Sequence, residues 1–213
     1  SHTIKKQSYN RDLLRAILEK NIRLLDYEVL TNEKGQRLIA FGKFAGMVGA
    51  HNALVTYGKR TGKFDLRRMN ECYDYAEARE IYRKTDFPAV KIVLTGTGRV
   101  GQGAARVLTD MGIEKVEPTD FLNEQYDRAV FTQLEVCDYV GSKAGEVCDI
   151  GDFYQHPERY ESIFAPYTKV ADIMVNGIYW DNQAPAFFTK ADMKNADFSI
   201  RVIADVTCDI APV

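Results

Sequence analysis

The sequence lacks the features that mark membrane, secreted and nucleic-acid-binding proteins. No apolar run in its 213 residues approaches the roughly 18 to 20 residues that span a bilayer, and its first residues show no basic-then-apolar signal pattern. Its 28 basic and 30 acidic side chains give a formal net charge of −2, so we expect no positive surface for nucleic acid or anionic lipid. These absences predict a cytoplasmic protein with neither a membrane nor a nucleic-acid partner.

Cysteine is scarce and scattered. Cys72, Cys137, Cys148 and Cys208 form no C-x-x-C pair, and no closely spaced histidine accompanies them. This pattern is typical neither of zinc ligands nor of a disulfide framework. We therefore expect buried free thiols and no bound metal.

Enough apolar residues are present, at 46 %, to build a substantial core. In the first segment, apolar residues recur at helical spacing after Asn10 and predict a helix over 11–20. Alternating stretches at 22–30 and 36–41 flank "TNEKG" and predict a β-hairpin. Together they indicate a compact helix-plus-hairpin unit.

A long helix over 43–60 follows, and it carries Gly46, Gly49, Ala50 and Ala53 on neighbouring turns. Small residues at this spacing let another backbone approach closely. This offsets the helix-propensity cost of glycine only if another segment does pack there. We interpret this segment as a helix connecting two domains. The alternative is a contact in a homo-oligomer.

Beyond a further helix at 75–84, strands and helices alternate. Apolar runs predict strands at 90–94, 115–117, 129–134, 173–176 and 200–206. Helical patterns lie at 100–110, 157–164 and 189–194. This alternation predicts an α/β fold with a doubly wound parallel sheet.

The stretch "KIVLTGTGRVGQGAARVL" joins the first of these strands to its helix. Gly96, Gly98 and Gly101 form G-x-G-x-x-G, in which the glycines allow a tight turn, close approach of a pyrophosphate and helix–strand packing. The phosphates then lie at the helix N-terminus. A glycine-rich turn that binds nothing is the alternative.

An acidic residue about 20 positions further on strengthens the dinucleotide interpretation. Asp120 follows the second predicted strand, where an acid binds the adenosine ribose and repels a 2′-phosphate. This favours NAD over NADP. The positive charge of Arg99 mildly favours NADP, although beside the glycines it could equally bind the pyrophosphate. His2, His51, His156 and Arg37 taken singly are typical of surface or structural residues.

Several stretches in order resemble one family. "SHTIKKQ", "DYEVLTNEKGQRLIAFGKFAGMVGA", "LTGTGRVGQGA", "NGIYWDNQAPAF" and "VIADVTCDI" resemble the NAD-dependent, lysine-forming saccharopine dehydrogenases and, more distantly, alanine dehydrogenase. The resemblance implies two Rossmann-like domains with a cleft between them. Residues 1–40 are then the end of the first, substrate-binding domain, and 41–213 the NAD-binding domain with the connecting helix 43–60. We expect the chain to be a fragment centred on that domain.

The resemblance also implies roles for single residues. The family's catalytic histidine falls on His2 and its substrate-carboxylate arginine on Arg37, while Asp209 matches an aspartate beside the nicotinamide. Asp120 again falls on the ribose-binding acid. The cofactor-binding set is completed by residues of the loop and of the "NGIY" strand end: Arg99, Val100, Gly177, Ile178 and Tyr179.

The reaction implied is oxidative deamination of an amino-acid substrate by hydride transfer to NAD. The family's catalytic lysine lies upstream of the histidine, and no residue here corresponds to it, so we expect this chain to bind nucleotide without turning over substrate. The glycine loop is also shorter than that of the saccharopine enzymes. An alanine dehydrogenase-like enzyme and a non-catalytic NAD-binding module are the alternatives.

Overall fold

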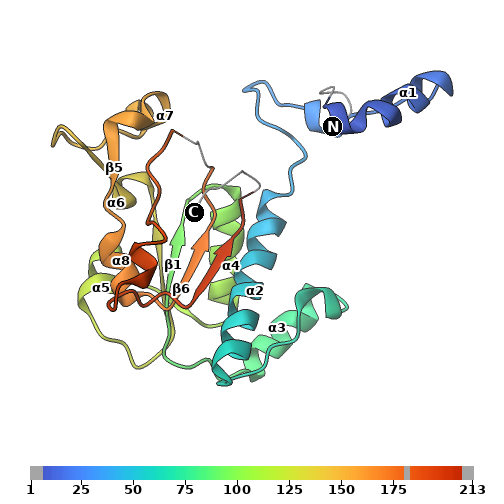
Figure 1. The fold of residues 1–213 in the computed structure, drawn as a ribbon. Helices are drawn as coiled ribbons and strands as arrows, with labels where there is room; N and C mark the ends of the chain where they lie inside the picture. The colour runs from blue at the N-terminus through green and yellow to red at the C-terminus, as the bar shows by residue number, and fades with distance from the viewer. Residues whose placement is uncertain (1–6, 180–182, 208–213) are drawn as a thin grey trace. The chain divides into compact units, whose positions relative to one another are not determined.

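The computed structural model describes residues 7–179 and 183–207 (Figure 1). Its contacts divide the chain into two compact units, Ser1–Phe41 and Gly42–Val213. Within the described ranges, no helix is both long and apolar enough to cross a membrane.

The first unit contains the predicted helix and only part of the predicted hairpin. Helix α1 (Arg11–Glu19) follows a 3-10 turn at Ser8–Asn10, and a second 3-10 turn lies at Tyr27–Val29. The hairpin turn forms, because Asn32 Oδ1 accepts hydrogen bonds from the backbone N–H of Lys34 (3.0 Å) and Gln36 (2.9 Å). Its arms make a single antiparallel bridge, Thr31 to Arg37, so the two predicted strands are wrong. A two-stranded ribbon alone is marginal, and no further strand joins it in the described part of this unit.

The second unit is built on a five-stranded sheet in the order β2-β3-β1-β6-β7 (Figure 1). All four pairings are parallel. The strands are β1 (Lys91–Thr95), β2 (Glu114–Lys115), β3 (Val130–Leu134), β6 (Ile173–Asn176) and β7 (Val202–Asp205). The predicted α/β fold with a parallel sheet is confirmed.

One face of the sheet is covered by the helices α2 (Gly42–Thr61) and α4 (Arg99–Asp110). Helix α3 (Tyr75–Lys84), which follows a 3-10 turn at Met69–Glu71, packs against these two helices. The small residues of α2 are used here. A Cβ on Gly46 would lie 1.9 Å from the carbonyl oxygen of Val100 in α4, and one on Gly49 would lie 2.3 Å from the side chain of Val206, directly after β7. The close backbone approach predicted for α2 therefore occurs inside this unit, against α4.

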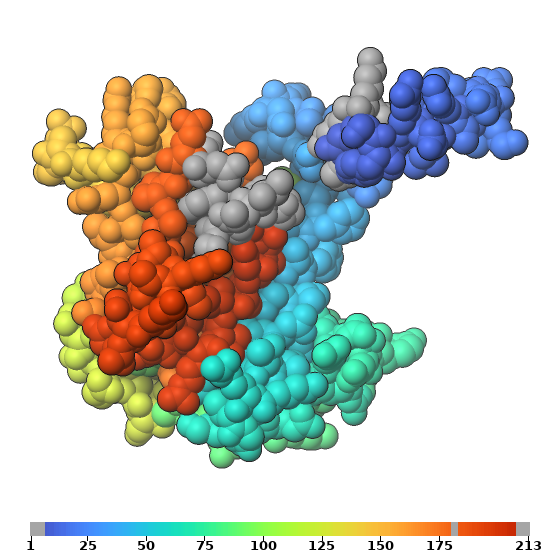
Figure 2. Space-filling view, viewed as in Figure 1, coloured from blue at the N-terminus to red at the C-terminus, as the bar shows by residue number. Residues whose placement is uncertain are grey.

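The other face carries shorter elements: helices α5 (Pro118–Asn123), α6 (Val136–Tyr139), α7 (Ile150–Gln155) and α8 (Ala165–Val170), and the antiparallel pair β4 (Val140–Ser142) and β5 (Tyr160–Ser162). Phe187, Phe188 and Ile200 from the segment between β6 and β7 complete the core of this face. Figure 2 shows that segment in orange-red on the outside of the unit.

The helix predicted at 157–164 is wrong. This stretch is a 3-10 turn, Pro157–Arg159, followed by β5, whose Tyr160 is buried and paired with β4. The helix predicted at 189–194 is reduced to the 3-10 turn Asp192–Lys194. In both places the local pattern was too short to distinguish a turn from a helix.

The expectation of free, buried thiols is wrong for Cys137 and Cys148. Cys137 of α6 and Cys148 form a disulfide, with their Cα atoms 5.7 Å apart, and both are only partly buried. Cys72 is a free thiol, also partly buried, and Cys208 lies outside the described residues. The chain passes through β4 and turns back between the two bonded cysteines. Their spacing of eleven residues gives no local signal of the disulfide.

Candidate functional site

The glycine loop follows β1 directly, and the fold itself requires two of its glycines. Gly96 has a φ of +94°, and a Cβ there would lie 2.8 Å from the carbonyl oxygen of Gly177. A Cβ on Gly101 would lie 2.0 Å from the carbonyl oxygen of Gly96. Only glycine therefore allows this turn and lets α4 begin so close to the strand end, as a dinucleotide loop requires.

Gly98 differs, because nothing in the protein requires a glycine there. Its φ of −72° is open to any residue, and a Cβ built on it meets no atom within 4 Å. An unfilled space beside the backbone is what a closely approaching ligand needs, and in dinucleotide folds that ligand is the pyrophosphate. The residues of the loop therefore fit a dinucleotide.

Hydrogen bonds fix the loop from both neighbouring strands. The Gly96 N–H donates to the carbonyl oxygen of Leu134 (2.9 Å), and Gln133 Nε2 donates to the carbonyl oxygen of Gly96 (3.0 Å). On the other side, the Gly177 N–H donates to the carbonyl oxygen of Thr95 (3.0 Å). The loop is thus held in its conformation by the ends of β3 and β6.

The N-terminus of α4 points its partial positive charge toward this loop. Gly98 is the N-cap, and no side chain caps the helix, which leaves its first N–H groups suited to an anion. Arg99 is exposed next to the loop, whereas the Val100 side chain packs toward Gly42 of α2. Of the two, Arg99 can offer its side chain to a phosphate, and Val100 only its backbone.

A cavity of about 220 Å³ opens beside the loop. Five of the predicted cofactor residues line it: Gly96, Gly98, Gly177, Ile178 and Tyr179. The rest of its lining is mostly apolar and includes an aromatic wall of Tyr139, Phe153, Tyr154 and Phe187 from α6, α7 and the segment after β6. Because ligand pockets usually span roughly 300–1,000 Å³, this smaller cavity suits part of a dinucleotide, with the rest lying along the loop.

A chain of side-chain hydrogen bonds joins the ends of three strands. Thr95 Oγ1 donates to Asn176 Oδ1 (2.7 Å), and Asn176 Nδ2 donates to Asp205 Oδ1 (3.3 Å). Thr95 and Asn176 are fully buried. These hydrogen bonds hold the ends of β1, β6 and β7 in register directly before Gly177. The sequence pattern did not predict them.

Asp120 lies in the first turn of α5, exposed, and it does not line the cavity. Burial raises the pKa of Tyr126, and the charge of Asp120 adds to that rise, so the two side chains are neighbours. Glu135, which is not among the predicted site residues, does line the cavity. The signal that could have found it is its position directly after a buried strand.

The residues assigned to chemistry lie outside the described residues or in the first unit. His2 and Asp209 lie outside the described residues. Arg37 lies in the first unit, where its guanidinium is 4.0 Å from a carboxylate oxygen of Glu28. Their roles stay predictions.

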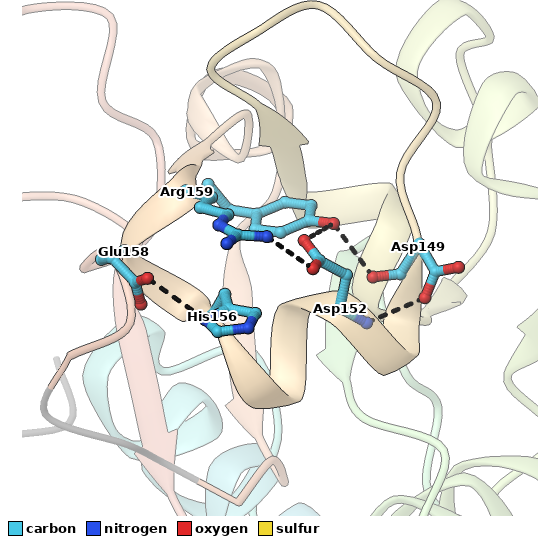
Figure 3. A network of polar contacts seen from close by, with 6 residues as sticks. Asp149, Asp152, His156, Glu158 and Arg159 are labelled. Carbon is cyan, nitrogen blue, oxygen red and sulfur yellow. Dashed lines mark hydrogen bonds and ion pairs between the residues drawn. The ribbon is translucent and has the colours of Figure 1, made fainter.

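A network of polar contacts surrounds α7 next to the aromatic wall (Figure 3). Asp149 caps the helix by accepting from the Asp152 N–H (2.8 Å), and Asp152 Oδ1 lies 3.0 Å from Arg159 Nη1. His156 Nδ1 lies 3.5 Å from Glu158 Oε1. The contacts of Asp149 and Asp152 position the helix, whereas the His156 pair lies after its end, so the structural role of His156 stays a prediction. In the described ranges, no three His, Cys, Asp or Glu side chains converge as metal ligands.

A parallel sheet with a glycine-rich turn from its central strand into a helix defines this chain as a Rossmann-like α/β protein. No protein-family model matches it.

The chain is similar in sequence to two kinds of known enzyme. It is 32 % identical to the mitochondrial alpha-aminoadipic semialdehyde synthase of Mus musculus, over 92 % of this chain and 24 % of that protein, and 28 % identical to the Arabidopsis thaliana protein of that name, over 99 % and 23 %. It is 26 % identical to saccharopine dehydrogenase [NAD(+), L-lysine-forming] of Neurospora crassa, over 98 % of this chain and 50 % of that enzyme. The predicted resemblance to saccharopine dehydrogenases is confirmed, and the chain spans about a quarter to half the length of these relatives.

Proposed function

We propose that this chain is the nucleotide-binding part of an NAD-dependent amino-acid dehydrogenase of the saccharopine type. The observation that carries the proposal is Gly98, which leaves space beside the loop that no protein atom fills. In this assignment residues 41–213 form the NAD-binding domain, and residues 1–40 belong to the domain that binds the amino-acid substrate. The cytoplasmic location stays part of the proposal.

The residues of the chain divide into binding and chemical roles. The loop and the start of α4 hold the pyrophosphate, Arg99 adds a positive charge, and the Gly177–Tyr179 backbone lines the space for the nicotinamide. NAD supplies the hydride acceptor when it is bound. The aromatic wall of the cavity excludes water from the part of the nucleotide that the cavity holds.

The substrate side is assigned by family resemblance. Arg37 would bind a substrate carboxylate by a bidentate pair, displacing its present neighbour Glu28. His2 would move the proton of the substrate amine, because an imidazole with an ordinary pKa of about 6.5 exchanges protons near neutral pH. Asp209 would stand beside the nicotinamide. Loss of hydride from the carbon that bears nitrogen leaves an imine, which water hydrolyses.

Two other functions compete with this one. An alanine dehydrogenase-like enzyme would use the same loop with a smaller substrate, and a non-catalytic module would use NAD as a structural ligand. Turnover of saccharopine by the full-length protein would support the proposal. Turnover of alanine alone would overturn it in favour of the first alternative, and no turnover of either with tight NAD binding would favour the second.

Nucleotide binding can be tested on the 213-residue chain itself. Titration of the chain with NADH, followed by quenching of protein fluorescence, should give saturable binding. Gly98→Val should weaken that binding at least about tenfold by filling the space beside the loop, without lowering the thermal midpoint of the free protein. Unchanged NADH affinity in Gly98→Val would contradict the assignment of this space to the pyrophosphate.

A further inference from the structure

The order of the strands changes which residue lies nearest the glycine loop. β3 pairs directly with β1, so that Thr95 stands level with Leu134, and the Gly96 N–H donates to the carbonyl oxygen of Leu134. Gly96 and Glu135 are the next residues of the two strands. β2 lies one strand further out, beyond β3, and its last residue Lys115 pairs with Phe131.

This order matters because dinucleotide folds bind the adenosine ribose with an acid at a strand end next to the phosphate loop. In the common strand order that neighbour is the second strand of the chain, which is why spacing favoured Asp120. Here the neighbour is the third strand. The strand end that adjoins the loop therefore carries Glu135, while Asp120 lies within α5.

The lining of the cavity also distinguishes Glu135 from the two other acids, Glu117 and Asp120. Glu135 lines it together with Gly96 and Gly98, whereas neither Glu117 nor Asp120 does. Glu117 is the N-cap residue of α5 and comes after the outermost strand. Of these acids, only Glu135 shares a surface with the loop.

The Glu135 carboxylate is also held in place. Glu135 and Asp138 form a capping box at the start of α6, in which the Asp138 N–H also donates to the Glu135 carbonyl oxygen at 3.1 Å and Asp138 Oδ2 accepts from the Glu135 N–H at 2.8 Å. This reciprocal capping fixes the side chain and uses only part of its capacity, because a carboxylate has two oxygens and about four acceptor sites. The remaining capacity is available to a ribose hydroxyl.

We propose that Glu135 accepts hydrogen bonds from the adenosine ribose of a nucleotide held by the Gly96–Gly98 loop, and that its charge selects NAD(H) over NADP(H). The inference rests on the proposed function. It assigns the discrimination to the end of β3 and removes it from Asp120.

A cation on β2 acts in the direction opposite to Glu135. Lys115 Nζ is 3.4 Å from Gln133 Oε1, on the strand next to β3, and its charge would attract a 2′-phosphate. Glu135 and Lys115 thus act in opposite directions on the same group. Removing one should reveal the influence of the other.

The test is a pair of titrations, with NADH and with NADPH, on the 213-residue chain. Glu135→Gln keeps an oxygen that can cap α6 but removes the charge, and it should shift the preference for NADH over NADPH by about tenfold or more toward NADPH. Lys115→Gln should shift the preference the other way. Asp120→Asn and Glu117→Gln should leave the preference unchanged, and so should Asp138→Asn, which alters the same cap without touching the proposed ligand.

The outcomes are distinguishable. A wild-type chain that binds neither nucleotide contradicts the proposed function and this inference together. A chain that binds NADH, in which Glu135→Gln leaves the preference unaltered or Asp120→Asn shifts it as strongly, overturns the inference alone. Thermal midpoints of the free variants within a few degrees of the wild type show that a lost preference is not lost folding.

Discussion

Gly46 of α2 and Val100 of α4 are in such close contact that a Cβ on Gly46 would lie 1.9 Å from the Val100 carbonyl oxygen. That oxygen belongs to the first turn of α4, directly after the glycine loop. The packing of α2 therefore determines where the start of α4 stands, and with it the position of the candidate phosphate site.

Gly46→Ala is expected to destabilise the fold. The added methyl meets backbone rather than a flexible side chain, so α2 and α4 must separate, at a cost of about 1–3 kcal/mol. Urea unfolding monitored by circular dichroism measures this loss. Gly98→Ala is the matched control, because its Cβ meets no protein atom, and it should unfold as the wild type does. Equal stability of the two variants would contradict the close packing.

Local patterns predicted much of this fold for a physical reason. The runs that became β1 and β6 are apolar and end in glycine turns, and burial of both faces of a parallel strand produces such runs directly. The Gly96–Gly101 turn is also predictable from the sequence, because a local φ requires glycine at position 96 and local packing requires it at position 101.

The position of Glu135 could not be predicted in that way. Nothing in the residues of β2 and β3 says which of them pairs with β1, because strand order is decided by how the connecting helices pack on the two faces. The Cys137–Cys148 disulfide depends similarly on the turn through β4. The two hairpin arms around Asn32 alternate as strands do, but without a partner strand in the described part of their unit they form one bridge.

His51 should make the stability of the protein fall in mild acid. Its ring is buried, with Nε2 2.8 Å from the Arg67 carbonyl oxygen and Nδ1 2.7 Å from the Tyr82 hydroxyl. A carbonyl only accepts, so Nε2 carries the proton and Nδ1 accepts from Tyr82. Burial lowers the pKa of His51, although the Arg67 carbonyl partly opposes this.

The sign follows from proton linkage. Below about pH 6.5 the unfolded chain binds a proton at this histidine that the folded chain does not, so the free energy of unfolding decreases until the pH passes the lowered folded pKa. Urea titrations at pH 7.5, 6.5 and 5.5 should show this decrease in the wild type. His51→Gln can keep both hydrogen bonds without titrating, and its decrease over the same range should be smaller. Identical pH dependence in the two proteins would rule out His51 as the source.

Reduction of the disulfide should destabilise the unit and loosen one wall of the cavity. Cys137 lies in α6, which contributes Tyr139 to the cavity, and Cys148 lies two residues before α7, which contributes Phe153. Opening a loop of this length costs about 3 kcal/mol on the chain-entropy account. A reductant should therefore lower the thermal midpoint. Cys72→Ser, which alters the free thiol, should keep the response to reductant, and the double variant Cys137→Ser, Cys148→Ser should abolish it.

Gln133 is expected to preorganise the glycine loop without touching the nucleotide. Its Nε2 donates to the Gly96 carbonyl oxygen at 3.0 Å from the strand beside β1, and it does not line the cavity. Gln133→Ala removes this hydrogen bond, so the Gly96 turn is less ordered in the free protein and loses more conformational entropy when a ligand binds. NADH affinity should fall by about three- to tenfold, which corresponds to the loss of one hydrogen bond of about 1 kcal/mol.

The matched control is Gln102→Ala, because Gln102 Nε2 also donates to a loop carbonyl, that of Thr97, at 3.2 Å, but from an exposed side chain of α4. An exposed hydrogen bond competes with water, so its loss should change NADH affinity less than the loss of the Gln133 bond. Gln133→Glu is the sharper variant, since it keeps the length of the side chain and replaces the donor with an acceptor opposite the Gly96 carbonyl. It should weaken binding more than Gln133→Ala does. Equal NADH affinity in all three variants and the wild type would show that the loop keeps its shape without β3.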